Sequence, residues 1–182
     1  MKKILMPLAD GFEEIETMTI VDVLRRAGLD VVMAGIKPGE LRGSRRVKIL
    51  PDAVLDDVKD QDFDMVILPG GQPGVDNLRR HPQVLELLKR MSVKNKMIGA
   101  ICAAPLVLRD AGLISGVRLT SFPGIEGELA GAKYDQGRIV VDGNVVTSRG
   151  PGTAMEFSLK IAELLCGKDR ADELAKIMLV RK

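Results

Sequence analysis

Cys102 is the residue whose position most clearly indicates chemistry. An apolar run of strand length, residues 97–101, precedes it, and helix-forming residues follow it. Pro105 suits the first turn of that helix, because the N–H that proline lacks is not used there. We therefore predict a strand-to-helix elbow at the carboxyl edge of a sheet, where helix N–H groups favour the thiolate and lower the thiol pKa. The alternative is a small buried hydrophobic residue.

A nucleophilic thiol needs a partner that transfers protons, and a loop near the N-terminus carries four carboxyl groups: Asp10, Glu13, Glu14 and Glu16. A carboxyl that turned inward would lose its hydration and tend to stay protonated. In that state it could donate a hydrogen bond to a thiolate and shuttle protons. The residue types alone do not choose among the four.

Two glycines, Gly70 and Gly71, follow another apolar run, residues 64–68. Their backbone N–H groups could bind an oxyanion, with the N–H of Ala103 as a further donor. A plain tight turn is the alternative, since glycine accepts backbone conformations that other residues avoid.

His81 is the single histidine in the chain, and it stands between two arginines and Pro82. That context is typical of a solvated helix start. With its single histidine there, the chain has no histidine to pair with Cys102, and a cysteine peptidase is disfavoured. A single histidine also excludes a multi-histidine metal site, and we expect neither a metal nor an organic cofactor. For the second cysteine, Cys166, we expect packing in the core or at its boundary.

The composition indicates one globular domain over residues 1–182, with 46% hydrophobic and 29% charged residues. A net charge of +2 with few aromatic residues gives no reason to expect nucleic acid as a partner. No apolar run approaches the roughly 20 residues of a membrane span, and the first residues do not read as a secretory signal. Two cysteines without a disulfide pattern favour a reducing, cytoplasmic environment.

Apolar runs alternate with amphipathic stretches along the whole chain. The predicted strands are 3–6, 30–36, 46–50, 64–68, 97–101, 117–120 and a hairpin of 139–141 with 145–147. The predicted helices are 13–27, one opening at 81–82, 103–112, 122–130, 154–165 and 171–178. This alternation predicts an α/β three-layer sandwich with a mainly parallel sheet. Loops at the carboxyl ends of its strands would then bring Cys102, the acidic loop and the two glycines together.

Four motifs follow one another along the chain: Asp10-Gly11-Phe12-Glu13-Glu14-Ile15-Glu16-Thr17, Leu68-Pro69-Gly70-Gly71, Ala100-Ile101-Cys102-Ala103-Ala104-Pro105 and Thr147-Ser148-Arg149-Gly150-Pro151-Gly152-Thr153. Together and in this order they resemble the ThiJ/PfpI superfamily, and within it the Parkinson-associated protein deglycase branch. The resemblance implies a flavodoxin-like, class I glutamine amidotransferase-like fold and a homodimer.

The same resemblance assigns roles to individual residues. It implies that Cys102 is the nucleophile and that Glu16 is the protonated carboxyl beside it. It also implies that Gly70, Gly71 and Ala103 form the anion pocket, and that Arg45 approaches this pocket from a partner subunit. Phe122 stands where many members of this branch carry a histidine, and Ala103 stands where the protease-like branch has one.

These considerations predict a cysteine-dependent protein deglycase or glyoxalase that acts on methylglyoxal, glyoxal or early glycation adducts of proteins. Cys102 would form the hemithioacetal and Glu16 would move protons. The alternative is a non-enzymatic sensor of oxidative stress, or a chaperone, that works through a Cys102 sulfinate. An intracellular peptidase ranks third, because the chain lacks a suitable base.

Overall fold

The computed structural model describes residues 1–180, so the last two residues of the predicted 1–182 domain lie outside the described residues. Its centre is a seven-stranded sheet with the order β10-β11-β7-β6-β1-β2-β5. The strands are β1 (Lys3–Leu8), β2 (Asp30–Gly35), β5 (Ala53–Val54), β6 (Met65–Leu68), β7 (Met97–Ile101), β10 (Ile139–Asp142) and β11 (Val145–Ser148). All neighbouring pairs are parallel except the β10–β11 hairpin.

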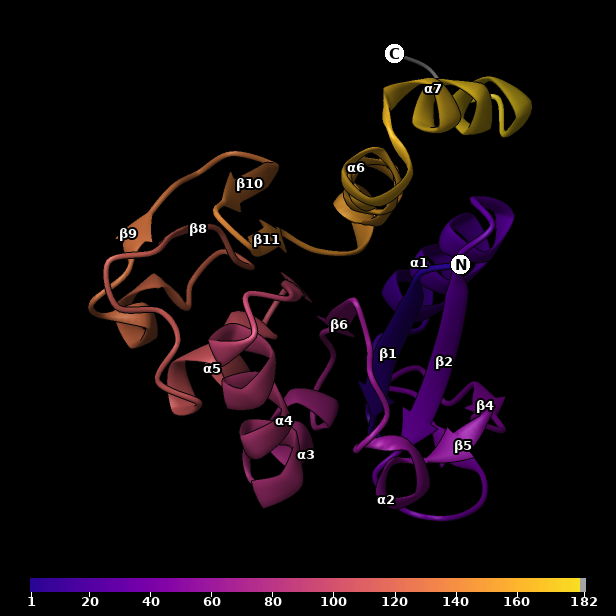
Figure 1. The fold of residues 1–182 in the computed structure, drawn as a ribbon. Helices are drawn as coiled ribbons and strands as arrows, with labels where there is room; N and C mark the ends of the chain where they lie inside the picture. Colours follow the sequence, from indigo (N-terminus) through magenta and orange to yellow (C-terminus); the bar gives the residue numbers. More distant parts are fainter. Residues whose placement is uncertain (181–182) are drawn as a thin grey trace.

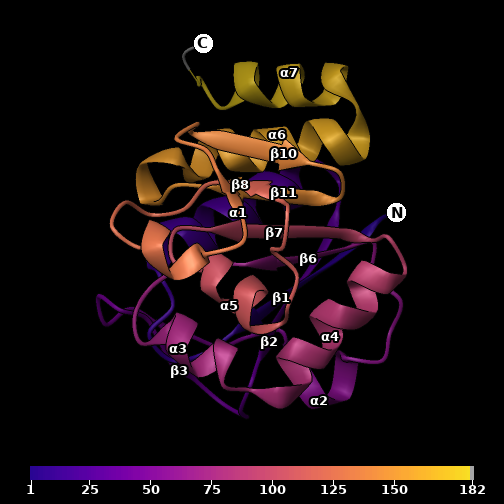
Figure 2. The same ribbon diagram turned by 90° about the vertical axis from the view of Figure 1, so that its left-hand side faces the viewer.

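Helices cover both faces of this sheet (Figure 1), and the view turned by 90° shows α7 stacked outside α6 (Figure 2). One face carries α1 (Glu14–Arg26), α6 (Ala154–Cys166) and α7 (Lys168–Ile177), and the other carries α2 (Leu55–Val58), α3 (Gly74–Arg79), α4 (Pro82–Val93) and α5 (Pro105–Asp110). The three layers confirm the predicted α/β sandwich with a mainly parallel sheet.

Strand β6 shows how the sequence produces these layers. Its side chains alternate between the two faces, because successive residues of a strand point in opposite directions. Met65 and Ile67 pack in the core beneath α1 and α6, while Val66 and Leu68 pack in the core beneath α4 and α5. Each face is apolar, so the strand reads as an unbroken hydrophobic run.

Several short elements differ from the prediction. The segment predicted as a helix over 122–130 forms only a 3₁₀ turn at Glu126–Leu129, because Pro123 and Gly124 precede it and Gly124 has φ +96°. The ribbon predicted over 46–50 pairs only at β4 (Lys48–Ile49), which lies antiparallel to β3 (Leu41–Arg42). Arg46 has φ +76°, which bends the chain out of the strand conformation.

The remaining elements are β8 (Arg118–Leu119), β9 (Lys133–Tyr134) and a 3₁₀ turn at Pro151–Thr153. Helix α7 begins at Lys168, ahead of the predicted start at residue 171. Within residues 1–180, no helix combines the length and the apolar composition needed to cross a membrane.

Candidate active site

The predicted site residues meet at the carboxyl edge of four neighbouring strands. The loop after β1 leads into α1 and Glu16, Gly70 and Gly71 follow β6, and Cys102 follows β7. Ser148 ends β11, which lies beside β7 in the sheet. Parallel strands place these loops at one edge, as predicted.

Cys102 occupies a sharp elbow between β7 and α5. Its φ is +64°, a left-handed conformation that costs a residue other than glycine roughly 1–3 kcal/mol. Two backbone hydrogen bonds hold it there: its N–H donates to Ser148 O over 3.0 Å, and its carbonyl accepts from Phe122 N over 2.8 Å. Pro105 is the first residue of α5, so the predicted strand-to-helix elbow is confirmed.

Glu16 is the carboxyl that turns inward. It lies in the first turn of α1 and has no solvent exposure. Oε2 accepts a hydrogen bond of 2.7 Å from Gly70 N, whereas the buried Oε1 has no hydrogen-bond partner among residues 1–180. Glu13 caps the same helix through a bond of 2.7 Å from Glu16 N to its carboxylate. The structure thus selects Glu16 from the acidic loop.

Burial raises the pKa of Glu16 from 4.5 to about 7. The hydrogen bond from Gly70 opposes that increase, and the negative charge of Glu13 adds to it. A carboxyl with this pKa is partly protonated at neutral pH, in line with the predicted protonated carboxyl.

The thiol pKa changes in the opposite direction from the prediction. Burial and then the negative charge of Glu16 raise the pKa of Cys102 above its ordinary value, although the N–H groups of Ala103 and Gly71 oppose this. The predicted decrease from the helix N-terminus is therefore wrong. Loss of hydration and a neighbouring carboxylate outweigh the dipole of a helix that spans only Pro105–Asp110. Protonation of Glu16 removes its charge and thereby favours the thiolate.

Gly70 and Gly71 are required for different reasons. A Cβ on residue 70 would lie 2.8 Å from Glu16 Oε2 and 3.0 Å from Cys102 Sγ, so the carboxyl and the thiol face one small space beside this backbone. Gly71 has φ +95°, and a Cβ there would lie 2.4 Å from Glu13 N. The structure therefore explains both glycines by close approach, and only Gly71 by a turn conformation.

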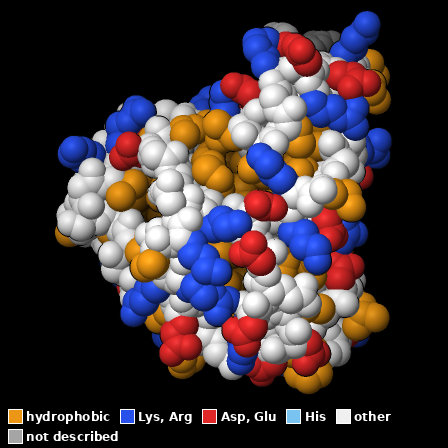
Figure 3. Space-filling view, viewed as in Figure 1, with side chains coloured by type: hydrophobic (Ala, Val, Ile, Leu, Met, Phe, Trp, Pro, Cys, Tyr) orange, Lys and Arg blue, Asp and Glu red, His pale blue; other side chains and the backbone are white. Residues whose placement is uncertain are grey.

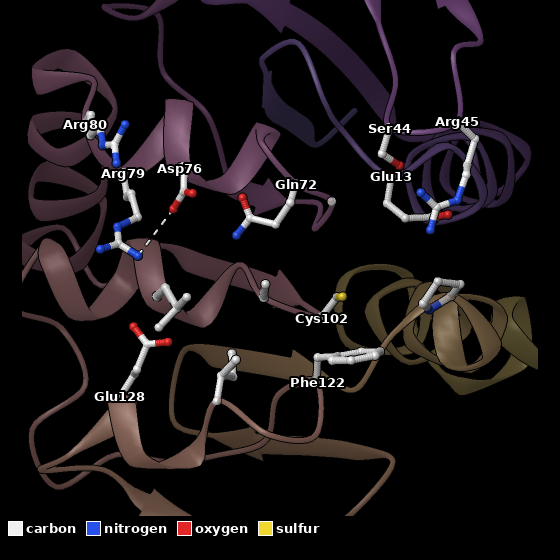
Figure 4. Close-up of a pocket in the computed structure, with 15 residues that line it drawn as sticks. Glu13, Ser44, Arg45, Gln72, Asp76, Arg79, Arg80, Cys102, Phe122 and Glu128 are labelled. Carbon is white, nitrogen blue, oxygen red and sulfur yellow. Dashed lines mark ion pairs between the residues drawn. The ribbon is translucent and has the colours of Figure 1, made fainter.

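Cys102 opens into a cleft of about 660 Å³ (Figure 4). Its lining residues are Glu13, Ser44, Arg45, Gly71, Gln72, Asp76, Arg79, Arg80, Cys102, Ala103, Leu106, Phe122, Ile125, Glu128 and Pro151. The volume falls within the roughly 300–1,000 Å³ that is typical of ligand pockets.

Arg45 lines this cleft from the same chain as Cys102, whereas the resemblance implied that a partner subunit would supply it. The carboxylate of Glu14 holds the loop that carries Arg45. It accepts hydrogen bonds from Arg45 N at 2.5 Å, from Ser44 Oγ at 3.0 Å and from Val47 N at 3.4 Å. Burial opposes ionisation of Glu14, but these bonds lower its pKa below the ordinary value.

Two residues considered from the sequence lie outside the cleft. His81 precedes the first turn of α4, at a helix start as predicted. Cys166 is exposed at the end of α6, so the prediction that it packs in or beside the core is wrong. It follows Leu164 and Leu165 in sequence, but the helix turns it toward solvent. Within residues 1–180, no cluster of histidine, cysteine and carboxyl groups is placed to hold a metal ion.

Sequence reasoning missed the residues that line the far part of the cleft. Arg79 belongs to α3, a short helix that the sequence did not reveal, and it pairs with Asp76 at 3.4 Å and with Asp110 at 2.9 Å. Glu128 lies in the 3₁₀ turn and pairs with Arg109 at 3.3 Å. The Arg79-Arg80 pair was a visible signal, but nothing in the pattern placed it near Cys102.

Comparison with known proteins identifies relatives of the whole chain. Protein dj-1beta of Drosophila melanogaster is 47% identical over 182 residues, covering 98% of this chain and 97% of that protein. Its crystal structure superposes with a TM-score of 0.97 at 46% identity and covers 100% of this chain and 99% of that one. The structure of oxidized Toxoplasma gondii DJ-1 has a TM-score of 0.97 at 35% identity and covers 100% of both chains.

Another relative, glutathione-independent glyoxalase DJR-1.2 of Caenorhabditis elegans, is 40% identical over 98% of this chain and 96% of that protein. The chain spans less than half of two longer Arabidopsis thaliana relatives, DJ-1 homologs B and A, of which it covers 41% and 46%. The family model described as DJ-1/PfpI matches residues 2–164. This chain therefore belongs to the DJ-1/PfpI family.

Proposed function

We propose that this chain is a cysteine-dependent enzyme of reactive carbonyls, of the glyoxalase or protein deglycase type. The observation that carries the proposal is the buried pairing of Cys102 with Glu16, whose pKa is raised to about 7. A carboxyl of this pKa is present in both protonation states near neutrality, as a proton shuttle requires. The relative that is named a glutathione-independent glyoxalase supports the same class of reaction.

With methylglyoxal, the thiol proton first passes to Glu16, which leaves a thiolate beside a neutral carboxyl. Sγ then bonds to the aldehyde carbon, and the aldehyde oxygen takes the proton from Glu16 to give a hemithioacetal. Glu16 next removes the hydrogen on that carbon as a proton, while the ketone oxygen gains a proton from solvent to give an enediol. Glu16 then returns its proton to the former ketone carbon, and the hydroxyl of the former aldehyde carbon loses its proton as the thioester carbonyl forms.

Water then attacks the thioester carbon, the carbon–sulfur bond breaks, and Cys102 recovers its proton as lactate leaves. The net change is the addition of one water molecule, with the aldehyde carbon oxidised and the ketone carbon reduced. The reaction therefore balances without an external oxidant. The N–H groups of Gly71 and Ala103, which already interact with the sulfur, are suited to stabilise the oxyanions of addition and hydrolysis.

The cleft is open beyond Cys102, which also suits early glycation adducts carried by protein side chains. In such an adduct the same thiol would attack the aldehyde-derived carbon that is bonded to the protein amine. The carbon–nitrogen bond would break, and the amine would leave with the proton held by Glu16. We therefore propose small aldehydes and glycated proteins as the substrates.

Lactate formation from methylglyoxal tests the proposal directly. The wild-type protein should form lactate, while Cys102→Ser and Glu16→Gln should lose at least about a hundredfold in kcat/KM, as expected for a lost nucleophile or proton-transfer group. Cys166→Ser is the matched control, since it removes the exposed thiol and should retain full activity. Equal slow rates for wild type and Cys102→Ser would refute the enzymatic proposal.

A second candidate is a redox sensor in which Cys102 becomes a sulfinate. The similar structure described as oxidized Toxoplasma gondii DJ-1 favours this candidate. Two molecules of peroxide would each transfer one oxygen to the sulfur, and the N–H groups of Gly71 and Ala103 would bind the resulting anion. Mass spectrometry after mild peroxide should then find two added oxygens on Cys102 and none on Cys166. Equal oxidation of both cysteines would count against a sensor.

A further inference from the structure

Phe122 places an exposed aromatic ring beside the nucleophile. Its ring lines the cleft next to Cys102 (Figure 4), and 47% of the residue is exposed. The backbone fixes this position, because Phe122 N donates to the carbonyl of Cys102 over 2.8 Å. The backbone that carries the ring is therefore tied directly to the backbone of Cys102.

The ring is also supported from behind. A Cβ on Gly150 would lie 3.3 Å from Phe122 Cδ2, so the ring packs against bare backbone at this point. That backbone is itself held, since Thr153 Oγ1 accepts from Gly150 N at 3.1 Å and lies 2.7 Å from Ser148 Oγ. The exposed side of the ring is thus presented by a rigid turn.

Phe122 is one of four large apolar residues that line the cleft. We call them together the apolar wall: Leu106, Phe122, Ile125 and Pro151. Glu13 and Arg45 come from other segments and lie on the far side of Cys102 (Figure 4), whereas Glu128 belongs to the 3₁₀ turn that directly follows Ile125. A substrate held at Cys102 would therefore meet an apolar surface on one side.

The size of the cleft supports a larger occupant than a three-carbon aldehyde. Its volume of about 660 Å³ would leave most of the space around methylglyoxal filled with water. An apolar substituent that displaced water from the wall would gain binding free energy, and a flat ring would gain an additional aromatic contact with Phe122.

We propose that the apolar wall is a specificity subsite for α-oxoaldehydes with a flat apolar substituent, with phenylglyoxal as the simplest example. The inference rests on the proposed function, because it assigns a substrate class to the same thiol. The reaction balances as before: phenylglyoxal and one water molecule give mandelate, the aldehyde carbon being oxidised and the ketone carbon reduced.

The first test compares kcat/KM for phenylglyoxal and methylglyoxal, from initial rates. Wild type should favour phenylglyoxal, and Phe122→Ala should lower the phenylglyoxal-to-methylglyoxal ratio by about tenfold, mainly through KM for phenylglyoxal. Phe122→Tyr retains the ring and should retain the ratio. Val93→Ala, at a position that is 88% exposed and outside the cleft, is the control for loss of a surface hydrophobic group.

The second test measures binding of the products, mandelate and lactate, by titration calorimetry or by NMR. Wild type should bind mandelate about tenfold more tightly than lactate, and Phe122→Ala should lose that difference. This measurement needs no turnover, so it tests the subsite independently of the proposed enzymatic function. Selective mandelate binding without turnover would refute the proposed function and support the subsite.

An unchanged substrate ratio in Phe122→Ala, with normal turnover of methylglyoxal, would refute the subsite and leave the proposed function intact. Equal losses for both aldehydes would do the same, because they would show that Phe122 supports Cys102 rather than selecting a substituent.

Discussion

The backbone N–H of Gly70 donates to Oε2 of Glu16 over 2.7 Å, at a point where the backbone also borders Cys102. This contact fixes one oxygen of the carboxyl and leaves Oε1 without a partner among residues 1–180. Oε2 also faces the small space that holds Sγ of Cys102, so the carboxyl is positioned to exchange a proton with the sulfur. Glu16 is thus held in place without having both oxygens occupied.

Replacing Gly70 by alanine should damage this arrangement. The new Cβ would lie 2.6 Å from Cys102 Cβ and 2.8 Å from Glu16 Oε2, so the elbow and the carboxyl would both have to shift. We expect Gly70→Ala to lose about 1–3 kcal/mol of unfolding free energy and nearly all activity toward methylglyoxal. Chemical denaturation and kcat/KM provide the measurements.

Gly127→Ala is the matched control, since no atom lies within 4 Å of the added Cβ. It should retain stability and activity. A Gly70→Ala protein with wild-type kcat/KM would show that the space between carboxyl and thiol is not needed for chemistry.

Glu16 should make the protein less stable as the pH rises. Its pKa is about 7 when folded against an ordinary 4.5, so the folded state binds more protons between these values. The free-energy cost of ionising this buried carboxyl is therefore absent below pH 4.5, grows between pH 4.5 and about 7, and is fully present above pH 7. The shift corresponds to about 3 kcal/mol.

Glu16→Gln removes this titration while keeping an acceptor for Gly70 N. Relative to wild type, the variant should gain up to about 3 kcal/mol at about pH 8 and much less at about pH 5, as measured by denaturant unfolding. Parallel stability profiles for the two proteins would contradict a raised carboxyl pKa.

Glu14 should stabilise the loop that presents Arg45. Glu14→Gln removes the charge from three hydrogen bonds to this loop and should cost about 1–3 kcal/mol of unfolding free energy. KM for methylglyoxal should rise more than kcat falls, because the loop lines the cleft without touching Sγ. Glu40→Gln, which breaks an exposed pair with Lys48, should change stability by less than about 1 kcal/mol.

The homodimer implied by the resemblance remains a prediction. Hydrophobic side chains gather in the upper middle of the face in Figure 3. On α1, Ile15 is 58% exposed and Met18 is 37% exposed. We expect light scattering to give twice the mass of one chain, and a variant with Ile15→Glu and Met18→Glu to give the mass of one. Val93→Glu is the control. A monomeric wild type would rule out the dimer.

Long apolar runs were sufficient to predict the central strands and the longer helices, as β6 and α4 illustrate. The two-residue strands β3, β5 and β9 and the short helix α3 were not predicted, because so few residues carry no periodicity. Helix α3 also begins at Gly74, a poor helix former whose place there depends on close contact with Gly11. Such contacts exist only after the chain has folded.

Cys102 and the two glycines were identified from sequence because each follows a buried strand. Glu16 also carried a signal: it precedes Ile20 by one helical turn, which places it on the buried face of α1. The thiol pKa was mispredicted because it depends on burial and on a carboxyl more than eighty residues away in sequence. A dipole argument from one helix includes neither.

The hydrogen bond from Cys102 N to Ser148 O ties the elbow to β11, which is made much later than β7 during synthesis. A nascent chain that ends before β11 lacks both this bond and the Gly150 backbone behind Phe122. Cys102 therefore acquires its folded surroundings only after residues more than forty positions later in the sequence have been synthesised.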